Sequence, residues 1–169
     1  MKKALFVLSI ILLLAVPGIS MSEKVPKTQK KTAFNFELKD LSGNKVKLSD
    51  YKGKVIFLNF FASWCPPCRE EMPSIQRLYE KTRSLKSFKL ITVSVDSIEN
   101  DARSFIKDGG YTFPVLLDTS STVSDIYGIR GIPATFIIDK KGRIIDMVVG
   151  GRDWASEEMI RKFKNLAGN

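Results

Sequence analysis

Residues 55–68 read Val55-Ile56-Phe57-Leu58-Asn59-Phe60-Phe61-Ala62-Ser63-Trp64-Cys65-Pro66-Pro67-Cys68, and this stretch decides the fold. The apolar run over 55–61 predicts a buried strand, and Pro66 suits the first position of a helix that follows it. The two cysteines of the chain, Cys65 and Cys68, then fall on the first turn of that helix, close enough to form a disulfide. The spacing therefore predicts a redox-active dithiol at a strand–helix junction.

A purely structural disulfide is the alternative, but a bridge that closes so short a loop removes little entropy from the unfolded chain. We assign Cys65 as the attacking thiol, because the end of a helix favours a thiolate and leaves it accessible. Cys68 lies on the inner face of the first turn and is assigned as the resolving thiol. We therefore expect Cys65 to be exposed and Cys68 to be largely buried.

Glu71 follows Cys68 by three residues and so lies on the same face of the predicted helix, beside the apolar row with Ile75 and Leu78. A half-buried carboxylate at this place could exchange a proton with Cys68. The alternative is an acidic residue that complements the helix N-terminus. The residues alone leave both interpretations open.

Strand and helix patterns alternate along the rest of the chain. Hairpins are expected from residues 34–38 with 46–48, and from residues 134–138 with 143–149. Hydrophobic spacing predicts strands and helices between them: helices over 66–85, 98–107, 120–127 and 154–166, the last capped by Asp153, and strands over 88–95 and 113–117. The alternation predicts an α/β fold with a parallel core and antiparallel edge strands.

The length of 169 residues suits one folded domain behind an N-terminal leader. Lys2 and Lys3 precede an apolar run over 4–16, which is shorter than a bilayer-spanning helix. We expect residues 1–20 to be a signal peptide cleaved after Ser20, in preference to an uncleaved membrane anchor over 4–19. Residues 21–32 form a polar linker and residues 33–169 the domain. The domain is then exported, to the periplasm or another extracytoplasmic compartment.

The chain has a net charge of +9 and contains no histidine. A Cys–His nucleophile, a Ser–His–Asp triad and a zinc site with histidine ligands are therefore excluded. Two cysteines alone make a poor metal site, so we expect no metal and no cofactor beyond the disulfide. The lysines are scattered, which favours a solvated surface over attraction to anionic headgroups or an acidic partner. Nucleic acid is not an expected partner of an exported protein.

Two motifs resemble those of the exported thioredoxin-like thiol–disulfide oxidoreductases of the TlpA/ResA type. The first runs from Leu48-Ser49-Asp50-Tyr51-Lys52-Gly53-Lys54 through Trp64-Cys65-Pro66-Pro67-Cys68, and the second is Gly128-Ile129-Arg130-Gly131-Ile132-Pro133. The resemblance covers about residues 33–167. It implies a thioredoxin fold with an N-terminal β-hairpin and a central strand–helix insert over about 97–117.

The resemblance also implies roles for single residues. It implies a cis peptide bond before Pro133, which local sequence cannot establish because about 5–6% of X–Pro bonds are cis. Glu71 matches the active-site glutamate of the family. Asn59 stands where cytoplasmic thioredoxins carry a buried aspartate, so proton transfer is expected to run through Glu71.

These observations together predict an exported oxidoreductase that reduces protein disulfides, with an apolar surface around Trp64, Pro66, Ile132 and Pro133 that docks the partner. Family members commonly keep apo-cytochrome c or metal-site thiols reduced, so the resemblance implies such protein substrates and a membrane-borne electron donor. We expect a monomer. The sequence leaves open a disulfide oxidase or isomerase and a non-catalytic module that binds partners. A thiol peroxidase is a third alternative, although the peroxidatic Thr-x-x-Cys motif is absent.

Overall fold

Strand β3 (Val55–Phe61) lies in the interior of the computed structural model, and all seven of its residues are buried. It pairs in parallel with β4 (Phe88–Ser94) and antiparallel with β6 (Ala134–Ile138). Successive side chains of a strand point to opposite faces of the sheet. The apolar side chains of β3 accordingly alternate between two hydrophobic clusters, one on each face. The strand predicted over 55–61 is therefore confirmed, and it is apolar at every position except Asn59 because both faces of the sheet are covered.

The sheet has seven strands in the order β2-β1-β5-β4-β3-β6-β7. Strands β5, β4 and β3 are parallel to one another, whereas each remaining strand is antiparallel to its neighbour. The four strands not yet bounded are β1 (Glu37–Asp40), β2 (Lys45–Lys47), β5 (Val115–Leu117) and β7 (Ile144–Val149). This arrangement confirms the predicted α/β fold, with β1 and β2 as the N-terminal hairpin.

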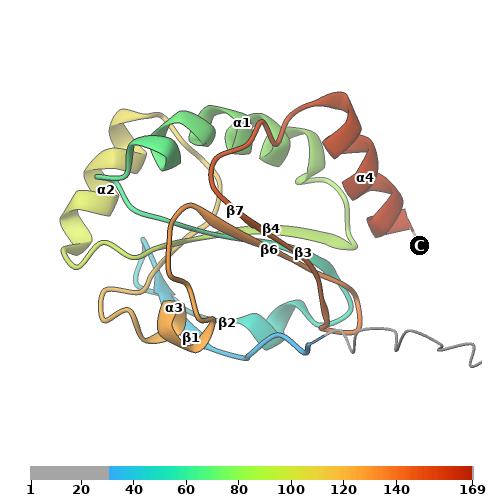
Figure 1. Ribbon diagram of the computed structural model, residues 1–169, viewed down its shortest axis with the longest axis horizontal. Coiled ribbons are helices and arrows are strands. Elements are labelled where there is room, and N and C mark those ends of the chain that lie inside the picture. Colours follow the sequence, from blue (N-terminus) through green and yellow to red (C-terminus); the bar gives the residue numbers. More distant parts are fainter. Residues whose placement is uncertain (1–30, 169) are drawn as a thin grey trace, which may run out of the picture.

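Helices cover both faces of the sheet (Figure 1). Helices α1 (Pro66–Thr82), α2 (Glu99–Asp108) and α4 (Glu157–Gly168) lie on one face, where Met72, Ile75 and Leu78 of α1 are fully buried. The short helix α3 (Thr122–Ile126) and the 3-10 helix η1 (Leu48–Tyr51) lie on the other face. Helix α2 and strand β5 together form the central insert expected over 97–117.

The last helix begins later than the sequence predicts. A helix over 154–166 capped by Asp153 is wrong, because α4 begins at Glu157 and Ser156 Oγ accepts a hydrogen bond from Met159 N. Trp154 is instead fully buried ahead of the helix, with its backbone N–H donating to Ser74 Oγ. These tertiary hydrogen bonds hold the backbone outside the helix. Strand β5 and helix α3 are also shorter than the predicted ranges 113–117 and 120–127.

The structure describes residues 31–168. The predicted signal peptide or anchor over 1–20 lies outside this range, as does nearly all of the linker predicted over 21–32. Strand pairing begins at Thr32, which forms an antiparallel bridge with Arg143. No helix within 31–168 has the length and apolar content needed to cross a bilayer.

Tyr127 contacts the segment that precedes β1 and holds it against the face of the sheet that α3 covers. Its ring packs edge-on against Phe34, Phe36 and Phe136, with centroid separations of 6.0, 6.2 and 5.1 Å. Its hydroxyl donates a hydrogen bond of 2.7 Å to the carbonyl oxygen of Phe34. Burial raises the pKa of the Tyr127 hydroxyl well above its usual range, so this group stays a donor at every physiological pH.

We expect Tyr127→Phe to lower the free energy of unfolding by about 1 kcal/mol, because it removes one partly buried hydrogen bond and keeps the aromatic contacts. Urea unfolding of the oxidised protein measures this. Tyr79→Phe is the control, since Tyr79 has no side-chain hydrogen bond within residues 31–168. Equal losses in the two variants would show that the bond to Phe34 does not stabilise the fold.

Candidate active site

The two cysteines are bridged at the N-terminus of α1. The chain leaves β3 at Phe61, and Cys65 is the N-cap residue of the helix. A disulfide joins Cys65 to Cys68, with the Cα atoms 5.3 Å apart. Pro66 and Pro67 have no N–H, so the amide of Cys68 is the first N–H of the helix. The predicted strand–dithiol–helix arrangement is confirmed.

Cys68 is fully buried, as expected, but Cys65 is only 4% exposed in the disulfide form. The expectation that Cys65 is exposed is therefore wrong for this redox state. The cause is the loop that ends at Pro133: Cys65 Sγ lies 3.7 Å from the carbonyl oxygen of Ile132. A disulfide sulfur carries no proton, so this is a packing contact, whereas a Cys65 thiol would be able to donate a hydrogen bond there.

The Ile132–Pro133 peptide bond is cis, which confirms the expectation drawn from the resemblance. The antiparallel pairing of β6 with β3 brings this loop beside Cys65, because Ala134 at the start of β6 registers with Phe60 near the end of β3. The carbonyl oxygen of Pro133 accepts a hydrogen bond of 2.8 Å from Gly150 N, which fixes the loop to the end of β7.

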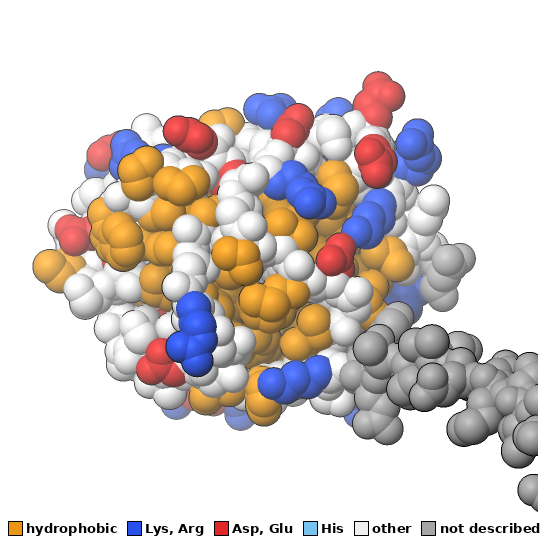
Figure 2. All heavy atoms as spheres, viewed as in Figure 1, with side chains coloured by type: hydrophobic (Ala, Val, Ile, Leu, Met, Phe, Trp, Pro, Cys, Tyr) orange, Lys and Arg blue, Asp and Glu red, His pale blue; other side chains and the backbone are white. Residues whose placement is uncertain are grey.

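The surface around the dithiol is partly apolar. Trp64 is 68% exposed, Pro66 is exposed and Ile132 is half-buried, as expected of a docking surface. Pro133 is buried, so the exposed part of this surface consists of its neighbours. Figure 2 shows hydrophobic side chains gathered over the middle of the face on which β7 lies. Exposed Val149 at the end of β7 was missed, because alternation in an edge strand does not show which side faces solvent.

Glu71 lies on α1 one turn beyond Cys68 and is 3% exposed, which is deeper than the half-buried position expected. Its Oε1 accepts a hydrogen bond of 2.8 Å from Asn59 Nδ2. Its Oε2 accepts one of 3.0 Å from Trp154 Nε1 and one of 3.3 Å from the backbone N–H of Arg152. Burial raises the pKa of the Glu71 carboxyl above its usual range, and the hydrogen bonds from Trp154, Asn59 and Arg152 oppose part of that rise.

The partners of Glu71 come from distant parts of the chain. Asn59 lies in the centre of β3, and its Nδ2 also donates to Thr135 Oγ1 at 3.0 Å, so the side chain links Glu71 to β6. Trp154 is 83 residues away in sequence from Glu71. No local sequence pattern marks Asn59, Glu71 and Trp154 as neighbours, because their contacts join distant parts of the chain.

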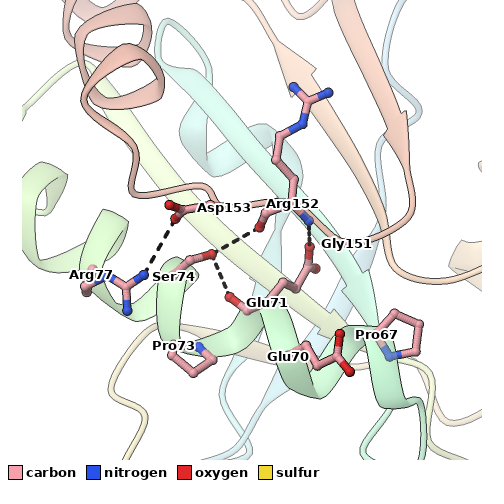
Figure 3. A pocket seen from close by; sticks show the side chains of 9 residues that line it. All are labelled: Pro67, Glu70, Glu71, Pro73, Ser74, Arg77, Gly151, Arg152 and Asp153. Carbon is pink, nitrogen blue, oxygen red and sulfur yellow. Dashed lines mark hydrogen bonds and ion pairs between the residues drawn. The ribbon is translucent and has the colours of Figure 1, made fainter.

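A cavity of about 560 Å³ opens beside the Glu71 network, between α1 and the loop 151–153 (Figure 3). Glu71 extends from α1 toward the backbone of Arg152, whereas Glu70 points away from it. Ser74 Oγ closes the network by donating to the carbonyl oxygens of Glu71 and Arg152, at 2.7 and 3.2 Å. An ion pair of 3.6 Å between Arg77 and Asp153 spans the far side of the cavity. The two glutamates thus have different surroundings, as their helix positions predict.

Asp96 is a second buried carboxylate near the dithiol, and no sequence motif marks its role. It accepts hydrogen bonds from Ser63 N at 3.0 and 3.1 Å, from Ser63 Oγ at 2.8 Å and from Ser94 Oγ at 2.7 Å. Because Ser63 precedes Cys65 by two residues, these hydrogen bonds to Asp96 fix the backbone position of the segment that leads into the dithiol. Within residues 31–168, no cluster of three or more Cys, Asp or Glu side chains could hold a metal ion.

The comparisons with known proteins agree with this geometry. Residues 30–147 match the AhpC/TSA family. The chain is 34% identical over 158 residues to thiol-disulfide oxidoreductase ResA of Bacillus thuringiensis (strain Al Hakam), a match that covers 89% of this chain and 91% of that protein. It is 33% identical over 172 residues to ResA of Bacillus subtilis (strain 168), covering 98% and 94%.

Solved structures are similar along most of the described range. StoA from Bacillus subtilis superposes with a TM-score of 0.67 at 30% identity, covering 78% of this chain and 97% of that chain. A thiol:disulfide interchange protein of the thioredoxin family from Chlorobium tepidum TLS gives a TM-score of 0.71 at 29% identity, covering 83% and 98%. The thioredoxin fold expected from the two motifs is therefore shared with these proteins.

The raised pKa of Glu71 predicts that its contribution to stability falls as pH rises. Below the unfolded value of about 4.3 the carboxyl is neutral in both states, and above it the unfolded state ionises before the folded state does. The unfolding free energy of wild type relative to Glu71→Gln should fall from that pH upward, by at most about 1.4 kcal/mol per pH unit.

Urea unfolding of the oxidised proteins between pH 4 and 7 tests this. Glu70→Gln removes an exposed carboxylate from the same helix and should give a curve parallel to wild type. Trp154→Phe should extend the fall to higher pH, because it removes a hydrogen bond that favours the charged form of Glu71. A difference between wild type and Glu71→Gln that is flat or rises over this range would contradict the raised pKa.

Proposed function

Because the chain belongs to the AhpC/TSA family and is a thiol–disulfide oxidoreductase of the ResA type, we propose that it is exported and reduces disulfides in protein substrates. The observation that carries the proposal is the Cys65–Cys68 pair at the N-terminus of α1, in contact with the Ile132–Pro133 loop. The charged and apolar leader over residues 1–20 supports export. The resemblance to the TlpA/ResA type favours the reducing direction, and the geometry serves exchange in either direction.

The chemistry transfers two electrons from the dithiol to the substrate. The Cys65 thiolate attacks one sulfur of the substrate disulfide, forming a mixed disulfide and releasing the other substrate sulfur as a thiolate. The Cys68 thiolate then attacks Cys65 Sγ, which breaks the mixed disulfide and releases the second substrate sulfur. The enzyme is left with its Cys65–Cys68 disulfide, and a membrane-borne dithiol donor reduces it again. No cofactor takes part in this cycle.

Protein substrates would approach as extended chains. Within residues 31–168, neither the N–H nor the C=O of Ile132 makes a backbone–backbone hydrogen bond. The C=O contacts Cys65 Sγ, and the N–H is available to a substrate strand beside Cys65. Trp64 and Pro66 add exposed apolar contacts. Recognition through backbone bonds depends little on the substrate side chains, which suits disulfides in unfolded proteins such as apo-cytochrome c or in metal-site proteins.

Glu71 is proposed to carry the proton of Cys68. Cys68 is fully buried, so its proton cannot pass directly to bulk water when the thiolate forms. Glu71 lies one turn away, burial raises the pKa of its carboxyl above the usual range, and it borders a cavity that opens to solvent. The chain has no histidine, and Asn59 at the centre of β3 does not titrate.

We expect Glu71→Gln to slow reduction of a protein disulfide by about 100-fold, the lower end of the range for loss of one proton-transfer group. In Glu71→Gln, the change of rate with pH that arises from ionisation of Glu71 should disappear. The fold should be kept, because the amide has nearly the same shape as the carboxyl. Stopped-flow mixing of the reduced variants with a disulfide substrate measures both. Glu70→Gln should behave as wild type, and unchanged rates and pH profile in Glu71→Gln would leave Glu71 with a structural role alone.

The direction of exchange can be read from the resting redox state in intact cells. We expect the Cys65–Cys68 pair to be mainly reduced after acid quenching and alkylation of free thiols. Cys68→Ala should trap mixed disulfides through Cys65, whereas Cys65→Ala should not, and mass spectrometry of the trapped species identifies the substrates.

Three other experimental outcomes would each indicate a different function. A pair that is oxidised at rest would indicate a disulfide oxidase or isomerase. A Cys65→Ala, Cys68→Ala double variant that keeps full function in cells would indicate a module that only binds partners. Rapid consumption of peroxide by the purified protein would indicate a thiol peroxidase.

A further inference from the structure

The dithiol and the N-terminal entry of the chain lie at opposite ends of the sheet. Val55 at the start of β3 registers with Phe88 of β4, and Ile56 registers with Ile138 at the end of β6. The β6–β7 turn therefore lies at the same end as the starts of β3 and β4. Cys65 follows the other end of β3, about 20 Å away along a strand of seven residues. Figure 1 shows α1 beginning on one side and the described chain entering on the side of the β6–β7 turn.

These two ends differ in charge. The segments 31–33, 48–54, 83–89 and 139–143 meet at the end remote from the dithiol and hold nine basic and two acidic side chains, a net charge of +7. We call this region the lysine end. Its basic residues are Lys31, Lys52, Lys54, Arg83, Lys86, Lys89, Lys140, Lys141 and Arg143.

The loops at the dithiol end, residues 62–65, 95–98, 118–121, 127–133 and 150–153, hold two basic and three acidic side chains, a net charge of −1. Lysines that are scattered in the sequence are thus gathered by the fold. The favoured interpretation of an evenly solvated basic surface needs revision for this end of the domain.

The two acids of the lysine end are already engaged. Asp139 forms an ion pair of 2.6 Å with Arg143, and Asp50 Oδ2 accepts a hydrogen bond of 2.9 Å from Lys47 N. The other eight basic side chains form no ion pair with a carboxylate within residues 31–168. Lys54 directly precedes Val55 and Lys89 registers with Ile56, so both lysines lie at this end of the sheet. Burial and, second, repulsion from Lys54 lower the pKa of Lys89. An external anion would relieve this repulsion.

A groove of about 260 Å³ lies within the lysine end. Its lining combines apolar side chains, including Leu48 and Ile138, with Lys52, Lys54 and Lys141. The lining also includes the carboxylate of Asp139, which is paired with Arg143. Anionic charge next to hydrocarbon is the chemistry of a phospholipid, whose phosphate would meet the lysines and whose glycerol and upper acyl carbons would meet the apolar lining. An acidic protein surface is another source of anionic charge, and the path of the chain favours the lipid.

The path of the chain brings this same end toward a membrane. Residues 31–33 enter the fold here, with Ile144 N donating to Lys31 O and Ala33 N donating to Gly142 O. The apolar run over 4–16 is separated from residue 31 by fourteen residues, a length that spans about 20 Å on average for a flexible chain. If that run associates with a membrane, the lysine end is held near the lipid surface.

We propose that the lysine end binds anionic phospholipid headgroups, so that the domain rests on the membrane with Cys65 and Cys68 facing away from it. The eight basic side chains of this end that form no ion pair within residues 31–168 would give a binding that is strong at low salt and weak at high salt. This inference rests on the proposed export with residues 4–19 kept as an uncleaved membrane anchor, the alternative to cleavage after Ser20, and it leaves the exchange chemistry unchanged.

Lysine acetylation of the full chain tests the proposal. The reduced protein is reconstituted into vesicles of phosphatidylcholine with 30 mol% phosphatidylglycerol and, separately, of phosphatidylcholine alone, so that the N-terminal segment is present in both. Mass spectrometry then gives the acetylation rate at each lysine. We expect Lys52, Lys54 and Lys141 to react about fivefold more slowly on the anionic vesicles, and this protection to vanish in 1 M NaCl.

Lysines of the N-terminal hairpin provide the internal control. Lys39 registers with Leu117 at the end of β5, on the dithiol side, and Lys45 pairs with Lys39 across the hairpin. Both should react equally on the two vesicle types. The triple variant K52Q/K54Q/K141Q should lose protection of Lys86 and Lys140, whereas K39Q/K45Q/K47Q, which removes the same charge, should keep it.

Protection that is equal on both vesicle types, or that extends equally to Lys39 and Lys45, would overturn the proposal. Reduction of a protein disulfide is measured on the same samples, which separates this inference from the proposed function. If the protein does not reduce the substrate disulfide but its lysines are still protected on anionic vesicles, the proposed reductase function is refuted and the lipid surface is not. Full activity without lipid-dependent protection would refute the lipid surface alone.

Discussion

A buried carboxylate has to be surrounded by hydrogen-bond donors, and this requirement on Glu71 connects the parts of the site. An ionised carboxylate in the interior costs several kcal/mol unless its oxygens are hydrogen-bonded. The donors are Asn59 from the centre of the sheet, Trp154 from the segment before α4 and the backbone of Arg152. Helix α1, which carries the dithiol, is thereby joined to the sheet and to the C-terminal segment. A change in the charge of Glu71 must therefore affect both the redox site and the stability of the domain.

The site itself is assembled at one end of the sheet by the order of its strands. Parallel pairing of β4 with β3 places Asp96 beside Ser63, just ahead of the dithiol. Antiparallel pairing of β6 with β3 places the Ile132–Pro133 loop beside Cys65 on the other side. Two loops and one helix thus meet at Cys65, and each is fixed by a strand that ends there. The opposite end of the sheet takes no part in the exchange. The exchange chemistry therefore does not restrict the residue types there, and basic side chains gather at that end.

The low exposure of Cys65 follows from this assembly and bears on how exchange proceeds. In the disulfide form the sulfur is packed against the carbonyl of Ile132, so an incoming donor thiolate has a narrow approach. Trp64 and Pro66 remain exposed around that approach. A partner that docks on these side chains would be positioned before any bond changes, which favours protein thiols over small thiols as exchange partners.

The sequence by itself determined the chemistry and the local elements. Fourteen residues from Val55 to Cys68 specify a buried strand, a turn and a helix with its dithiol, because hydrophobic period and the preferences of proline are local properties. Absence of histidine, read from composition alone, excludes an imidazole as the proton carrier, and the resemblance adds the match of Glu71 to the active-site glutamate of the family. The cis bond at Pro133 needed the resemblance of a whole motif, since one dipeptide does not determine its isomer.

Only the tertiary structure decided the remaining features, because they depend on contacts between residues far apart in the sequence. Trp154 lies outside α4 since its hydrogen bonds to Ser74 and Glu71 outweigh its local preference for a helix. Cys65 is covered by a loop that lies 67 residues further along the chain. The lysines form one charged end because strand register, and not sequence order, sets which loops meet. Hydrophobic pattern fixes which elements form, whereas packing and register decide which side chains become neighbours.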